Sequence, residues 1–96
     1  IRKMNGAGYR GWPDRGYWAR HNSMNIHFMI EYKKKGEKPD PVQQRIMGLL
    51  IDLGTRCYCV DNPDDGKEVI RGEMQDRFPR VIFVEGKWGK WLELAK

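Results

Sequence analysis

The sequence predicts one α/β domain in which a mixed β-sheet is flanked by helices. Three consecutive segments support this: an alternating apolar run at residues 26 to 33, a well-delimited helix at 40 to 54, and a second apolar run at 55 to 61. Strand, helix and strand in this order imply a crossover and a parallel pairing. The 96 residues suit a single domain, 1 to 96, with a small core.

The run IHFMIEYK at residues 26 to 33 is the clearest strand of the sequence. Alternation places its even-numbered residues on one face and His27, Met29, Glu31 and Lys33 on the other. An acid and a base therefore lie side by side at the end of an apolar strand.

The helix at residues 40 to 54 has signals at both ends. Asp40 suits the N-cap, Pro41 suits the first helical position, and Gly54 can end the helix. We expect its apolar face to consist of Val42, Ile46, Leu49, Leu50 and Leu53.

The N-terminal third of the chain has weaker patterns. Residues 1 to 13 are rich in Gly and Arg and predict a loop or an extended lead-in, 15 to 20 predict a short strand, and 21 to 25 a turn.

After the strand at 55 to 61, residues 62 to 66 predict a loop. A second helix follows, with Val69, Ile70, Met74 and Phe78 on one side. The last residues, 79 to 96, predict a hairpin that turns at the Gly-Lys-Trp-Gly stretch.

Composition and charge narrow the class of protein. The chain is 40% hydrophobic and 32% charged, which is typical of a folded domain. A net charge of +5 favours polyanionic partners such as nucleic acid or anionic membranes. No apolar run has the length of a membrane span, and the first residues contain no signal-peptide core, so we expect a soluble protein.

The two cysteines, Cys57 and Cys59, fall on one face of the strand at 55 to 61. We interpret them as reduced core thiols, because no second Cys or His pair stands at zinc spacing. They fit a reducing, cytoplasmic compartment.

Three residues suggest hydrolytic chemistry at a phosphodiester. Asp14 follows Pro13 at the start of the earlier strand, and Glu31 and Lys33 end the next one. Carboxylates hold a hard divalent cation, which lowers the pKa of bound water, and a lysine offsets developing negative charge.

Each of these residues also has a simpler interpretation. Asp14 suits a turn after proline, Glu31 and Lys33 suit a solvated ion pair, and Gln43 stands at capping-box spacing from Asp40.

Together, these residues resemble the PD-(D/E)xK nucleases, and specifically the stand-alone phage or bacterial type of the virus-type replication-repair nuclease (VRR-Nuc) domain. The resemblance covers about residues 1 to 70. It rests on NG at 5 and 6, GWPD at 11 to 14, IEYK at 30 to 33, Gly36, Pro41, Gln43, and LG at 53 and 54.

The resemblance implies a restriction-endonuclease-like core and a metal-dependent deoxyribonuclease. Asp14, Glu31 and the backbone carbonyl of Tyr32 would bind Mg²⁺ or Mn²⁺, Lys33 would be the catalytic lysine, and Gln43 would point into the same site. It further implies a homodimer that acts on branched DNA, such as a Holliday junction, in replication, recombination or repair.

One departure from the family concerns its N-terminal helix. In the family this helix precedes the GxPD segment and supplies a further acidic residue, and the sequence begins too late to contain it. Three explanations stay open: the chain is truncated, the helix is dispensable, or catalysis is impaired. In the last case the protein would be a DNA-binding module with a nuclease fold. Besides a nuclease and a DNA-binding module, a small structural or interaction protein is the third interpretation of the chain.

Basic residues near these motifs are expected to contact phosphates without sequence preference. They are Arg2, Lys3, Arg10, Arg15, Arg20, Lys34, Lys35 and Lys38.

The tryptophans are assigned separately. We expect Trp18 in the core, and Trp88 and Trp91 either in the core or at a dimer interface formed by the hairpin.

Overall fold

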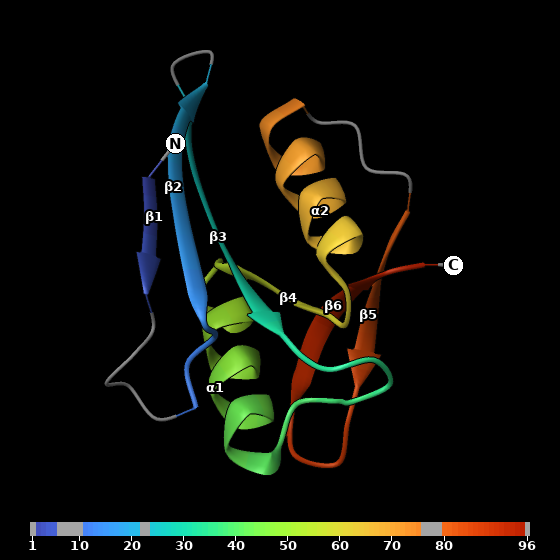
Figure 1. Ribbon diagram of the computed structural model, residues 1–96. Helices are drawn as coiled ribbons and strands as arrows, with labels where there is room; N and C mark the ends of the chain where they lie inside the picture. Colours follow the sequence, from blue (N-terminus) through green and yellow to red (C-terminus); the bar gives the residue numbers. More distant parts are fainter. Residues whose placement is uncertain (1, 6–10, 22–23, 76–79, 96) are drawn as a thin grey trace.

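The structure, a computed structural model, describes residues 2–5, 11–21, 24–75 and 80–95. These residues form a sheet of six strands and two helices (Figure 1). The strands are β1 (Arg2–Asn5), β2 (Arg15–His21), β3 (Met24–Tyr32), β4 (Arg56–Val60), β5 (Val81–Glu85) and β6 (Lys90–Leu94). The helices are α1 (Pro41–Asp52) and α2 (Pro63–Gln75).

The sheet is mixed, in the order β1-β2-β3-β4-β6-β5. Strands β1, β2 and β3 pair antiparallel, β3, β4 and β6 pair parallel, and β5 pairs antiparallel with β6. Helix α1 makes the crossover between β3 and β4, and their register places Glu31 beside Cys59. The predicted α/β class, the parallel crossover and the C-terminal hairpin are confirmed.

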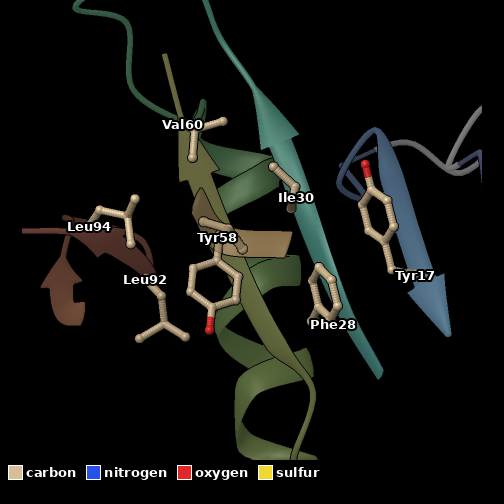
Figure 2. Packing of buried hydrophobic residues seen from close by; sticks show 8 residues of the cluster. Tyr17, Phe28, Ile30, Tyr58, Val60, Leu92 and Leu94 are labelled. Carbon is tan, nitrogen blue, oxygen red and sulfur yellow. The ribbon is translucent and has the colours of Figure 1, made fainter. Parts of the chain in front are cut away.

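The core lies on both faces of the sheet. On the face that α2 covers it consists of Tyr17, Phe28, Ile30, Tyr58, Val60, Val69, Leu92 and Leu94 (Figure 2). On the face that α1 covers it consists of Met29, Met47, Cys57, Cys59 and Trp91. Both cysteines are free and buried, as expected. Among the described residues, no helix has the length and apolar character to cross a membrane.

The apolar face predicted for α1 is wrong in part. Leu49 and Leu53 are 60% and 83% exposed, whereas Gln44, Met47 and Gly48 are buried. The reason is the β5–β6 hairpin, whose turn packs directly on α1.

Two glycines permit this close approach. A Cβ atom on Gly89 would lie within 2.0 Å of the Gln44 carbonyl oxygen, and one on Gly48 would lie 3.3 Å from the backbone nitrogen of Lys90. The Gln44 side chain is satisfied inside the contact, because it donates to the Pro39 carbonyl (2.9 Å) and accepts from the Trp88 amide (3.1 Å).

Strands replace two segments predicted to be irregular near the N-terminus. Residues 2–5 form β1 rather than a lead-in without pairing, because they hydrogen-bond along β2. In the predicted turn at 21 to 25, β2 extends to His21 and β3 begins at Met24, while residues 22 and 23 lie outside the described part.

Helix α2 begins earlier than predicted and includes most of the expected loop at 62 to 66. The Asn62 side chain accepts from the Asp65 amide (2.8 Å), and Pro63 occupies the first helical position. Val69 is buried as expected, and Phe78 lies outside the described residues.

The tryptophans divide into one core residue and several surface residues. Trp91 is 3% exposed and belongs to the core. Trp18 is 40% exposed, so its predicted core position is wrong, and it stacks on the neighbouring His27. Trp88 is 41% exposed, and of the two hairpin indoles it is therefore the one that another molecule can reach.

Candidate active site

The start of β2 and the end of β3 lie side by side, and hydrogen bonds connect Asp14 to β3. The Asp14 amide donates to Oε1 of Glu31 (3.0 Å), and the Tyr32 amide donates to Oδ2 of Asp14 (3.2 Å). Antiparallel pairing produces this arrangement, because Arg15 pairs with Ile30 and the preceding residue therefore faces Glu31. The two carboxylates are brought together as predicted.

The segment that carries Asp14 is fixed on α1. Gly11 has φ +84°, and a Cβ atom there would lie 2.6 Å from Cγ1 of Val42. Only glycine combines this left-handed conformation with so close an approach. Pro13 is fully buried next to Asp14. The aspartate thus stands on backbone that is anchored on both sides.

Glu31 is the buried centre of the site. It is 2% exposed, and its Oε2 accepts from Nε2 of Gln43 (2.8 Å) and lies 3.3 Å from Nζ of Lys33. Lys33 directly follows β3, two residues after Glu31, and lies on the same side as Glu31, as continued alternation predicts. The interpretation of Glu31 and Lys33 as a solvated pair is wrong, because the Lys33 side chain is 16% exposed and that of Glu31 is 3%.

Gln43 takes both of the roles that the sequence suggested. Its amide donates to Oδ1 of Asp40 (2.8 Å) and its Oε1 accepts from the Asp40 amide (3.0 Å), which completes a capping box. Its Nε2 is left to donate to Glu31. One side chain therefore caps α1 and orients the buried carboxylate.

The electrostatics of the Asp14–Glu31 pair favour the binding of a cation. Burial raises the pKa of Glu31, and the negative charge of Asp14 raises it further, while Lys33 and the hydrogen bonds lower it. The like charge of Asp14 thus disfavours ionisation of Glu31. A divalent cation between Asp14 and Glu31 would remove that repulsion.

A hard metal ion fits this donor set in part. Within the described residues, no group of three or more His, Cys, Asp or Glu side chains is placed to hold a metal. The candidate ligands are the carboxylates of Asp14 and Glu31, with the Tyr32 carbonyl expected as a further oxygen. Mg²⁺ commonly binds one or two carboxylates and keeps several waters, which matches such an open set.

The sequence analysis did not place two residues, Cys59 and Glu93, next to the site. Cys59 pairs with Glu31 across β3 and β4, and burial, followed by the charges of Glu93 and Glu31, raises the pKa of its thiol to about 12. A thiol with so high a pKa is not a nucleophile at neutral pH. Glu93 accepts from Lys38 (3.1 Å) and from the Trp91 indole (2.7 Å). The alternation in KWLEL was the available signal for Glu93.

The predicted phosphate-contacting residues fall in different places. Lys34 and Lys35 are exposed directly after β3, close to the site, whereas Lys38 is paired with Glu93. Arg15 shares its face with Ile30, opposite to Glu31.

The remaining predicted cations lie farther away or are not described. Arg20 is exposed six residues along β2 from Asp14, or about 20 Å at the usual rise of a strand. Arg2 and Lys3 have their backbone in β1, and Arg10 lies outside the described residues.

Comparison with known proteins gave no relative: no family model, no curated protein and no solved structure matches the chain.

Proposed function

We propose that the protein is a metal-dependent DNA endonuclease of the PD-(D/E)xK type, with a VRR-Nuc-like site. The observation that carries the proposal is the convergence of Asp14, Glu31, Lys33 and Gln43 from β2, β3 and α1 into one hydrogen-bonded cluster. The first two residues stand at the ends of paired strands, where the motif requires them.

The residues divide the chemistry among themselves. Asp14 and Glu31 would hold Mg²⁺ or Mn²⁺, which would neutralise the phosphate and lower the pKa of bound water. Lys33 positions the attacking water and stabilises the negative charge that develops on the phosphate oxygens. Gln43 fixes the orientation of Glu31 through its Nε2.

Polynucleotide is the substrate class that the charge of the chain favours. The net charge is +5, and Lys34 and Lys35 stand exposed next to Lys33. Contacts from such residues to phosphates give affinity without base preference. Branched DNA in replication, recombination or repair remains the predicted substrate.

A homodimer also remains a prediction. The hairpin cannot contribute Trp91 to an interface, because that indole is in the core. Trp88 is its exposed indole and lines, with Leu49, a groove of about 550 Å³ between α1 and the hairpin. We therefore expect Trp88 rather than Trp91 at any interface that the hairpin forms.

The test compares cleavage by the parent and by Lys33→Ala. End-labelled four-way junctions and linear duplexes are incubated with Mg²⁺ or Mn²⁺, and product bands are followed in time. We expect Lys33→Ala to cut at least about 100-fold more slowly, because electrostatic stabilisation of the transition state is lost.

Lys67→Ala is the matched control, since Lys67 is an exposed lysine on α2. It should cut like the parent. Equal rates for the parent and Lys33→Ala would contradict the proposal, and so would cleavage that continues in EDTA. Salt-sensitive DNA binding without any cleavage would point instead to a DNA-binding module with an impaired site.

A further inference from the structure

Part of the sheet face that carries the candidate site is open to solvent. Helix α1 packs mainly against β4 and β6 on this face. Farther along β2, the side chains of Trp18 and Arg20 are exposed on the same face. Trp18 stands four residues from Asp14, which corresponds to about 13 Å along the strand.

An aromatic pair forms the centre of this open face. The rings of Trp18 and His27 stack with their centroids 4.0 Å apart and their planes 9° from parallel. The stack lies on the opposite face of the sheet from the Tyr17 and Phe28 side chains, which belong to the core on the α2 side.

The stack on Trp18 is one contact that positions the imidazole of His27. Among the described residues, buried Nε2 of His27 has no hydrogen-bond partner. Burial, and secondarily the charge of Arg56, lowers the pKa of His27, so the neutral ring is favoured. The imidazole thus backs one face of the exposed Trp18 indole.

The charge of these three strands suits a polyanion. Their sequences, RKMN, RGYWARH and MNIHFMIEY, contain four Lys or Arg residues and a single acid, Glu31, which lies at the site itself. Arg15 stands on the opposite face, whereas Arg20 supplies exposed positive charge on the open face, two residues from Trp18. A cation beside an exposed aromatic ring matches the chemistry by which single strands are bound.

We propose that this open face binds a single-stranded segment of nucleic acid, with one base stacked on Trp18 and the backbone beside Arg20, leading to Asp14 and Glu31. The occupant is single-stranded because a base inside a duplex already stacks on its neighbours and has no free face for an indole. The strand covers the distance to the site in no more than about four nucleotides at a duplex spacing of ~3.4 Å. This inference rests on the proposed nuclease function and names the part of the substrate held next to the cut.

Binding is tested separately from cleavage. The fluorescence anisotropy of a labelled single-stranded oligonucleotide, and of the duplex of the same sequence, is titrated with protein in EDTA, so that no cutting occurs. Trp18→Ala should weaken single-strand binding about 5- to 150-fold, which is the loss expected for one base–aromatic stack. Trp18→Phe should retain most of the affinity, and the duplex should be affected less.

Phe83→Ala is the matched control, because Phe83 is an aromatic residue that is 63% exposed on β5, at the other edge of the sheet. It should bind like the parent, and circular dichroism checks that both variants are folded. Unchanged binding by Trp18→Ala would overturn the inference. An equal loss with Phe83→Ala, or no binding by the parent, would also overturn it.

The cleavage assay separates this inference from the proposed function. A parent that cuts DNA, together with Trp18→Ala that binds single strands normally, would leave the nuclease and remove the binding face. A parent that never cuts but binds single strands through Trp18 would leave the binding face and remove the nuclease.

Discussion

Two glutamates are buried on opposite faces of the sheet, Glu31 at 2% and Glu73 at 6% exposure, and their surroundings differ. Glu73, on α2, accepts two hydrogen bonds from the Arg56 guanidinium and one from the Tyr58 hydroxyl. Glu31 has one lysine, one amide side chain and a second carboxylate, Asp14, as its neighbours.

The comparison distinguishes a structural carboxylate from a functional one. A bidentate guanidinium satisfies a carboxylate completely and leaves no reason for a further cation. The hydrogen bond that Arg56 donates to Glu73 is also the main cause of the raised pKa of Arg56. At Glu31, burial and then the charge of Asp14 work against ionisation, so added positive charge would stabilise the site.

The largest expected effect is on cleavage at the functional carboxylate. Glu31→Gln keeps the shape of the side chain but removes the charge that would hold the proposed metal. Metal-dependent cleavage should fall at least about 1,000-fold, a loss of several kcal/mol of transition-state stabilisation. Product formation from labelled junctions measures it.

The metal itself gives a second measurement for the same variant. Mg²⁺ at ten times its dissociation constant should stabilise the parent by about 1.4 kcal/mol, and should leave Glu31→Gln unchanged. Equal stabilisation of both proteins would show that the ion binds elsewhere.

The next effect concerns the structural carboxylate and should appear in stability instead. Glu73→Gln breaks the ion pair with Arg56, and we expect a loss of about 1–3 kcal/mol. This loss is smaller than the usual cost of removing one partner of a buried ion pair, because the Arg56 side chain is 48% exposed and can be solvated. Urea denaturation measures the change.

Glu68→Gln is the control for Glu73→Gln, because its ion pair with Arg71 lies near the surface of the same helix. It should change stability by less than about 1 kcal/mol. Loss of cleavage by Glu73→Gln at full stability would contradict the distinction between the two glutamates.

The smallest effect is the pH dependence of stability in metal-free buffer. The pKa of Glu31 is raised in the folded chain, so the folded state keeps its proton at pH values where the unfolded state has lost it. The resulting stabilisation of the folded state is complete below the pKa that Glu31 has in the unfolded chain. It is lost as the pH rises through the raised pKa that Glu31 has in the folded chain.

Glu31→Gln cannot lose this contribution, because its side chain does not ionise. Above that window it should be more stable than the parent, and in acid the difference should vanish. Urea midpoints at pH 4 and pH 7.5 test this. A variant that is less stable at the higher pH would show that ionised Glu31 stabilises the fold.

Local sequence patterns were sufficient to predict the positions of several residues of the candidate site. Strand alternation placed Glu31 and Lys33 on one face, and the capping signals placed Gln43 in the first turn of α1. The position of Asp14 follows once the two strands pair antiparallel.

Long-range contacts decided what the sequence did not predict. The buried face of α1 depends on Gly48 and Gly89, which let the hairpin turn pack against the helix. The burial of Glu73 depends on Arg56 and Tyr58, which lie 15 to 17 residues earlier on another element. Neither contact has a local sequence signal.

The double role of Gln43 has a consequence for motion. The first turn of α1 frays by breaking the capping box, and the Gln43 side chain that closes the box also holds Glu31. Opening of this turn therefore removes, at the same moment, one of the hydrogen bonds that orient the buried carboxylate. Amide hydrogen exchange in the first turn of α1 should then report how long the site stays assembled, and a bound metal should slow it.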